Sequence, residues 1–325
     1  MTRVLQKIWR KSRFVFGVAL KTLRIFSSSL KHVLKPFKIS DELFVINDTS
    51  HQNSIGRGFF SLFREVLYLI SLNSEKNIEV AYYKTDYNDE PDDNIWEYCF
   101  LPIDNRPERK KPYRYLFATE PFKNSFADSQ RYRNIFNRII NDRIKIRKEI
   151  ENKISEFISR NFSGKKVVGV HFRGADTLYA TNLQPKRSLK KLPIENYFSV
   201  IDGLLKEGYN AIFLGTDDEE AFKKFKEKYG EKLCSYSSIR SSEQGAVYDW
   251  GLWRTNISLK KTDKRQVCEE ALVDAVLLSK CDHFIHGQSN LSCAVKYFSA
   301  RIPSKNMELP ELSFIQRAEN LVLYS

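Results

Sequence analysis

The chain has 325 residues, which is long enough for two domains, and a formal net charge of +13. Its contents of 42% hydrophobic and 29% charged residues are typical of a soluble globular protein. Its five cysteines are spread widely and form no Cys-x-x-Cys pair, so neither a disulfide framework nor a zinc site is predicted. No stretch approaches the roughly 20 apolar residues of a membrane-spanning helix, and no secretory signal is expected.

The first 40 residues carry ten lysines and arginines and no acidic residue, which is most of the net charge. Basic and bulky apolar residues recur there at spacings of three, four and seven, the pattern of an amphipathic helical segment. Such a segment suits an anionic membrane surface, so we expect residues 1–38 to bind one and the protein to be cytoplasmic and peripheral to the membrane. The alternative is a helix that packs on the protein's own body. Nucleic-acid binding is not expected, because no nucleic-acid module follows.

Residues 41–160 are predicted to form an N-terminal α/β domain. A strand at 43–46 leads through a polar loop that contains Gly56 and Gly58 into a helix over 59–72. This is the layout of a phosphate-facing βα unit, although the glycine spacing is not the full dinucleotide fingerprint. A long helical pattern over 125–162 is predicted to bridge into the second domain.

Residues 161–325 are predicted to form a C-terminal domain in which short apolar strands alternate with helices. This alternation is typical of a parallel, doubly wound sheet. The expected strands begin at Val167, Ala211 and His283, and the expected helices cover 218–229, 266–280 and 294–298.

Three polar clusters directly follow these strands, at 171–176, 215–218 and 286–292. Open α/β sheets bind ligands outside the carboxyl ends of their strands, so the clusters are expected to meet in one crevice. His171 and Arg173 point the same way on an extended chain, and the arginine fork suits phosphate oxygens. The sequence therefore predicts a nucleotide site.

Each cluster also has a purely structural interpretation. Arg173 and Asp176 can form an ion pair with each other, and Ser289 and Asn290 can cap a helix. Thr216 or Asp217, followed by the acidic residues Glu219 and Glu220, can cap a predicted helix. His283 and His286 are interpreted as core or strand-end histidines rather than as metal ligands.

Five segments taken in order resemble the fucosyltransferase superfamily of GT-B glycosyltransferases, especially the α-1,6-fucosyltransferases. They are residues 168–176, 192–197, 213–218, 251–256 and 271–292, within a resemblance that covers about 165–300. The resemblance implies two Rossmann-like domains, with the nucleotide-sugar site in the C-terminal one. It also implies an inverting glycosyltransferase that needs no divalent metal and no cofactor beyond its nucleotide-sugar substrate. The expected reaction moves a sugar, most simply fucose from GDP-fucose, onto a glycan or lipid-linked saccharide at the membrane surface.

The resemblance also implies roles for individual residues. Arg173 would hold the β-phosphate, His171 and either Asp217 or Asp218 would contact the guanine, and Ser289 and Asn290 would meet the diphosphate.

The sequence offers two candidates for the catalytic base. Asp176 is the catalytic candidate beside Arg173, although it can instead orient that arginine. Glu65 is another candidate for the base, and we interpret it as a solvated helix residue. Gly174 and Thr177 replace an arginine and a lysine of the family motif. A different nucleotide-sugar donor is therefore the first alternative, and a catalytically silent membrane-bound interaction protein is the second.

Overall fold

The computed structural model describes residues 40–47, 58–83, 85, 93–104, 113–116, 124–173, 193–236, 240 and 264–308. Asp176, the predicted amphipathic segment 1–38 and the segment 251–256 lie outside these residues.

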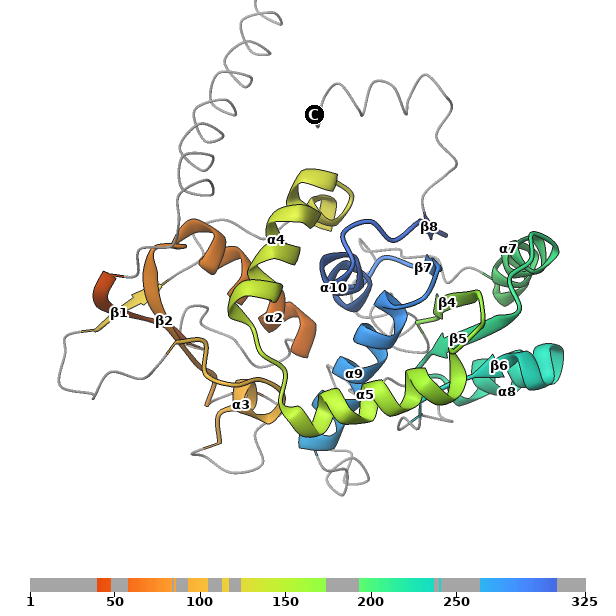
Figure 1. Cartoon of the computed structure of the whole chain (residues 1–325), viewed down its shortest axis with the longest axis horizontal. Helices are drawn as coiled ribbons and strands as arrows, with labels where there is room; N and C mark the ends of the chain where they lie inside the picture. Colours follow the sequence, from red (N-terminus) through yellow and green to blue (C-terminus); the bar gives the residue numbers. More distant parts are fainter. Residues whose placement is uncertain are drawn as a thin grey trace, which may run out of the picture.

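A three-stranded parallel sheet with the order β2-β1-β3 forms one side of the molecule (Figure 1). Its strands are β1 (Ser40–Asn47), β2 (Lys76–Ala81) and β3 (Tyr113–Leu116). Helix α2 (Phe59–Leu72) follows β1 and buries its apolar side, and the short helix α3 (Ile95–Cys99) is capped by the side chain of Asn94. The strand and helix predicted at the start of this region are confirmed.

The predicted long helix over 125–162 is wrong in detail, because two α-helices replace it. A short 3-10 helix, η2 (Asn124–Ala127), precedes α4 (Gln130–Arg143), and α5 (Lys148–Asn161) follows after a break. In the break the chain is extended at Ile144, and Ile146 forms an antiparallel bridge with Phe100. The backbone groups of the break therefore bond to a segment more than 40 residues earlier, which no local pattern reveals.

A five-stranded parallel sheet with the order β6-β5-β4-β7-β8 forms the other side. Its strands are β4 (Val167–His171), β5 (Ala211–Gly215), β6 (Leu233–Cys234), β7 (His283–His286) and β8 (Ser304–Asn306). The helices around it are α7 (Ile194–Lys206), α8 (Glu219–Tyr229), α9 (Lys264–Ser279) and α10 (Asn290–Phe298), and the 3-10 helix η3 (Gly230–Lys232) precedes β6. The predicted parallel alternation of strands and helices is confirmed.

Alternate residues of the central strands pack against opposite helix layers. Val168 and Val170 belong to the cluster with α7 and α8, whereas Val167 faces the cluster that contains α9. Helix α9 lies very close to the sheet, since a Cβ atom on Gly169 would come within 2.9 Å of Cys281 Sγ. Glycine at this position therefore permits the close packing of helix on strand.

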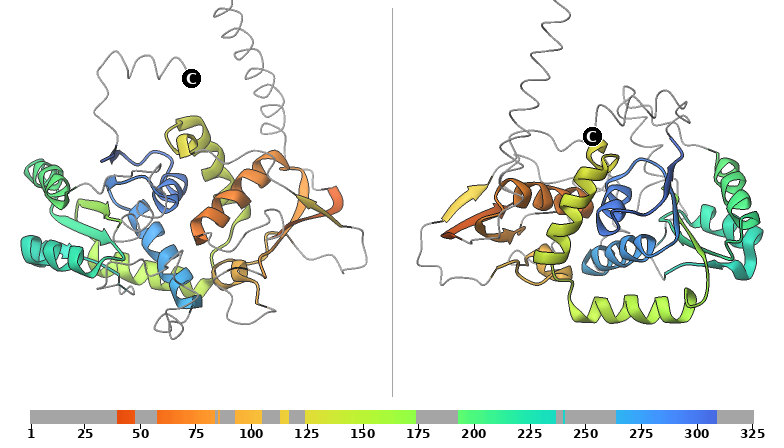
Figure 2. Two further views of the ribbon diagram at one scale, coloured as in Figure 1. Left: turned by 180° about the vertical axis from the view of Figure 1, so that it is seen from behind. Right: turned by 45° about the horizontal axis from the view of Figure 1, so that its top comes forward.

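One hydrophobic core extends from the three-stranded sheet to the five-stranded one. Helices α2, α4 and α10 meet between the sheets, and α5 runs from the region of α3 toward the five-stranded sheet (Figure 2). The Phe63 ring of α2 stacks on Phe298 of α10, with 5.5 Å between ring centroids. The predicted division into domains at residue 160 stays a prediction. Within the described part of the chain, no helix is both long and apolar enough to cross a membrane.

Candidate functional site

The ends of three neighbouring strands meet at the carboxyl edge of the five-stranded sheet. His171, the last residue of β4, is in register with Gly215 of β5 on one side and with His286 of β7 on the other. The polar residues that follow these strands therefore start from one line across the sheet. The edge brings the three clusters of the sequence together, as far as the structure describes them.

Hydroxyl groups of α10 bond to the imidazole of His171. Its Nδ1 lies 3.0 Å from Ser292 Oγ and 3.5 Å from Ser289 Oγ, and the two hydroxyl oxygens are 2.9 Å apart. Ser289 is the N-cap of α10, where its Oγ also accepts a hydrogen bond of 2.9 Å from the backbone N–H of Ser292. All three side chains are buried. Ser289 thus caps the helix, as expected if its role is structural. It also contacts His171, which is predicted to bind the guanine.

Asn290, the first residue of α10, links this helix to α2. Its side-chain oxygen accepts a hydrogen bond from the guanidinium of Arg64, which lies on α2 and is only 3% exposed. Because the amide oxygen faces Arg64, the amide NH₂ group of Asn290 is turned to the other side of the planar amide. The buried Arg64, from the first half of the chain, therefore sets the orientation of Asn290, a residue that is predicted to bind the diphosphate.

The aspartate pair after β5 divides into two environments. The cap of α8 is Asp218, not the predicted Thr216 or Asp217. Asp218 is buried, and its Oδ1 accepts a hydrogen bond of 2.9 Å from the backbone N–H of Ala221. Asp217 is half-buried and close enough to Asp274 of α9 for its charge to raise the pKa of that carboxyl group. The guanine-binding role predicted for this pair stays a prediction.

Asp274 carries a buried carboxyl group that was not among the site residues predicted from the sequence. Burial raises its pKa to about 8; the charge of Arg240 opposes this shift, and those of Glu270 and Asp217 add to it. A Cβ atom on Gly215 would lie 3.4 Å from Asp274 Oδ2, so the carboxyl group lies against the end of β5. Among the described residues, Oδ1 of Asp274 has no hydrogen-bond partner. The feature of the sequence that could have revealed Asp274 is that it is the one acidic residue inside the apolar run 271–278.

Glu308 is a second carboxyl group that the sequence did not single out. It follows β8, and a Cβ atom on Gly287 would lie 2.6 Å from its Oε1, so the carboxyl group lies over the end of β7. Burial raises the pKa of Glu308, whereas a backbone hydrogen bond from Gln288 and the positive charge of Arg173 lower it. Within the described chain its Oε2 is buried without a hydrogen-bond partner. The half-buried Arg173 is therefore close enough to a carboxylate to interact electrostatically.

The histidines of β7 have different environments. The Nδ1 of His286 lies 2.8 Å from the carbonyl oxygen of Gly287, and since a carbonyl only accepts, Nδ1 donates. Burial lowers the pKa of His286 to about 3, which keeps the ring neutral. His283 is half-buried, and burial lowers its pKa as well. Across the residues that the structure describes, no group of three or more His, Cys, Asp or Glu side chains is placed to hold a metal ion.

The interpretation of Glu65 as a solvated helix residue is wrong. The side chain is 3% exposed, and its Oε2 accepts a hydrogen bond of 3.3 Å from the hydroxyl group of Tyr82. The helical pattern of α2 is apolar on so many sides that this polar position is buried with the rest of the helix.

Solved structures of fucosyltransferases are among those to which the chain is similar. No protein-family model matches the sequence, and no curated protein matches it significantly. The fucosyltransferase NodZ from Bradyrhizobium is 15% identical, with a TM-score of 0.48 over 80% of this chain and 94% of that one. NodZ α-1,6-fucosyltransferase soaked with GDP-fucose is 17% identical, with a TM-score of 0.47 over 80% and 93%. POFUT1 in complex with GDP is 12% identical, with a TM-score of 0.46 over 83% and 100%.

Proposed function

We propose that the protein is a GT-B glycosyltransferase that takes its sugar from a guanosine diphosphate donor, most simply GDP-fucose. One observation carries the proposal. The carboxyl edge of the five-stranded sheet brings together a buried carboxyl group, an arginine and the capped N-terminus of α10. These groups match the guanine and the diphosphate of such a donor.

Asp274 is the group that selects guanine in this proposal. Guanine presents two neighbouring donors, its N1–H and its 2-amino group, and a carboxylate accepts both at once. Uracil, thymine and cytosine lack this pair of adjacent donors. Its Oδ1, which has no hydrogen-bond partner in the described part of the chain, and its position beside Gly215 suit a planar base at the end of β5.

The diphosphate is held by Arg173 and by the N-terminus of α10 with its residues Ser289 and Asn290. Backbone N–H groups and the helix dipole favour an anion there, and an arginine adds a bidentate charged donor. Negative charge grows on the β-phosphate as its bond to the anomeric carbon breaks. Donors already in place stabilise that charge without reorganisation, which is the main catalytic effect in this scheme.

An inverting transfer also needs a group that accepts the proton of the acceptor hydroxyl. As that oxygen bonds to the anomeric carbon, the diphosphate leaves with the electrons of the broken bond and the proton passes to a base. Asp176 is the candidate from the sequence. Glu308 is a candidate from the structure, because it is a partly buried carboxyl group near Arg173, and one of its oxygens has no hydrogen-bond partner among the described residues.

The test is calorimetric titration of the purified protein with GDP, UDP, CMP and dTDP in parallel. The proposal expects selective GDP binding that Arg173→Ala weakens by about tenfold or more, the value of one charged hydrogen bond. If the protein instead binds another nucleotide selectively, the proposed fold stands and the proposed donor changes to a sugar linked to that nucleotide. Absence of binding to any nucleotide would contradict the proposal.

The acceptor is proposed to be a glycan or lipid-linked saccharide at a membrane surface. This rests on the basic and apolar periodicity of residues 1–38, which supports binding to anionic lipid. Co-sedimentation of the full chain with vesicles of phosphatidylserine and of phosphatidylcholine tests it. Equal partitioning into both, at low and high salt, would remove the basis for a membrane-bound acceptor.

A further inference from the structure

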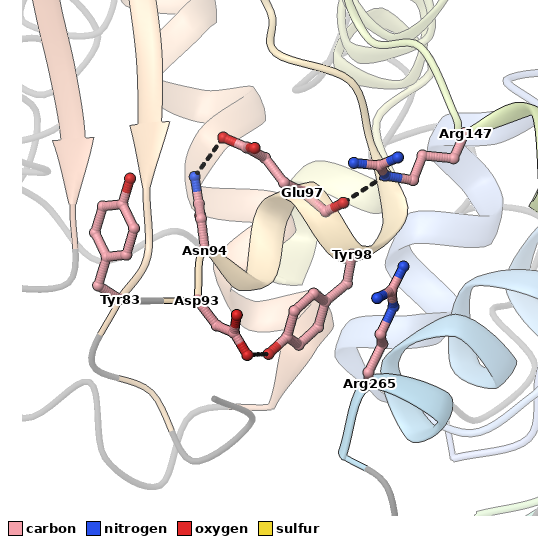
Figure 3. Close-up of a pocket in the computed structure, with 7 residues that line it drawn as sticks. All are labelled: Tyr83, Asp93, Asn94, Glu97, Tyr98, Arg147 and Arg265. Carbon is pink, nitrogen blue, oxygen red and sulfur yellow. Dashed lines mark hydrogen bonds between the residues drawn. The ribbon is translucent and has the colours of Figure 1, made fainter. Parts of the chain in front are cut away.

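A polar pocket of about 300 Å³ lies among α3, the residues that follow β2 and the beginnings of α5 and α9. Its lining residues come from the end of β2, from α3 and from the first turns of two later helices. They are Tyr83, Asp93, Asn94, Glu97, Tyr98, Arg147 and Arg265. In Figure 3, Tyr83 lies on one side of the hollow and the two arginines lie on the opposite side.

The pocket is at the carboxyl edges of both sheets. Tyr83 follows the carboxyl end of β2. Arg147 and Arg265 stand at the beginnings of α5 and α9, and each of these helices runs back along the five-stranded sheet into the amino end of a strand. The beginnings of both helices are therefore on the same edge as His171. Ligands of parallel α/β sheets bind at this edge.

The pocket's polar side chains are held in place by one another. The hydroxyl group of Tyr98 donates to Asp93 Oδ2 at 2.6 Å, and Asn94 Nδ2 donates to Glu97 Oε1 at 3.1 Å. The Nε of Arg147 donates to the carbonyl oxygen of Glu97 at 2.5 Å. A site whose side chains are already ordered loses less entropy when a ligand binds.

The charges of the pocket cancel, since two carboxylates face two guanidinium groups. A free anion or cation gains little from such a balance, whereas a neutral ligand with many hydroxyl groups finds both donors and acceptors. The guanidinium of Arg265 lies 5.5 Å from the centroid of the Tyr98 ring, and Tyr83 supplies a second aromatic ring. Aromatic rings pack against the apolar C–H faces of a sugar ring.

We propose that this pocket binds a neutral sugar unit of the acceptor saccharide, apart from the unit that receives the transferred sugar. The inference rests on the proposed function and adds a distal acceptor subsite to it. Arg265 precedes Asp274 by nine positions on α9, which is about 13 Å along the helix axis. This separation places the pocket outside the proposed guanine site, and the proposal expects an oligosaccharide acceptor that reaches both the pocket and the transferred sugar.

The test uses saturation-transfer NMR of the full chain with cello-, malto- and chito-oligosaccharides of increasing length as probes. At least one series is expected to bind more tightly as it lengthens. Arg265→Ala, at an exposed position, and Tyr83→Ala are each expected to weaken the longer probes about tenfold, as expected for one charged hydrogen bond or one ring contact. GDP titration of the same variants is expected to be unchanged.

Matched controls are Arg160→Ala at the far end of α5 and Tyr209→Ala before β5, both at the opposite edge of the five-stranded sheet. These two changes are expected to leave all saccharide binding intact. Three results would overturn the subsite: no oligosaccharide binding by the native protein, equal binding by the pocket variants, or sulfate binding that Arg265→Ala removes. Failure of GDP binding by the native protein would instead overturn the proposed function, so the two failures are distinguishable.

Discussion

Asp274→Asn tests the role of the buried carboxyl group through both stability and ligand binding. In the folded protein the pKa of Asp274 is raised to about 8, chiefly by burial, compared with 3.8 for an exposed aspartate. The folded state therefore retains a proton that the unfolded chain releases near pH 4. Stability contributed by this proton is complete below that pH and is lost as the pH rises toward 8, by about 1.4 kcal/mol per pH unit.

Asparagine keeps the shape of the side chain and cannot ionise. The stability of Asp274→Asn relative to the native protein is therefore expected to increase by about 3 kcal/mol between pH 5 and pH 7. Urea unfolding at pH 5, 6 and 7 measures this difference, with Asp142→Asn at an exposed site of α4 as the control. A difference between variant and native protein that does not change with pH would refute the reasoning.

The same substitution is expected to weaken GDP binding, because one acceptor of the guanine donors becomes an amide NH₂ group. A bidentate contact to a base contributes about 1–3 kcal/mol of discrimination, so a loss of at least about fivefold is expected. Since guanine requires the carboxylate, GDP affinity of the native protein is expected to rise as the pH increases toward 8. Unchanged GDP affinity in the variant would exclude Asp274 from the site. Together these outcomes describe a residue that reduces stability and serves binding.

Three further substitutions test the remaining parts of the site and the core. Arg64→Met leaves the side-chain oxygen of Asn290 without its buried donor, so we expect a loss of about 1–3 kcal/mol in urea unfolding together with weaker GDP binding. Unchanged GDP affinity would show that Asn290 does not depend on Arg64. Glu308→Gln is expected to slow sugar transfer by about 100-fold or more while the Kd for GDP changes little; an unaffected rate would leave Asp176 as the candidate base. Phe63→Ala removes a ring stacked between the two sheets and is expected to cost about 3–5 kcal/mol in one thermal transition, whereas two separate transitions would contradict the single core.

Local sequence patterns were sufficient to predict those elements whose structure is decided by neighbouring residues in the sequence. The strand at the start of the first sheet and helix α2 follow from an apolar run and a helical period, and both are confirmed. The break between α4 and α5 could not be predicted, because the extended backbone at Ile146 pairs with Phe100. The burial of Glu65 was missed for a related reason, since the side chain meets Tyr82 from the following strand.

The sequence by itself determined the alternation of strands and helices and the polar residues that follow each strand. Parallel strands align their carboxyl ends, so His171, Asp217 and Ser289 could be assigned to one edge without coordinates. Only the tertiary structure decided that Asp274, Glu308 and Arg64 reach this edge. Their positions depend on the packing of α9 against Gly215, on the turn after β8 and on the contact of α2 with α10. Such contacts join residues far apart in the chain, and a local pattern contains no information about them.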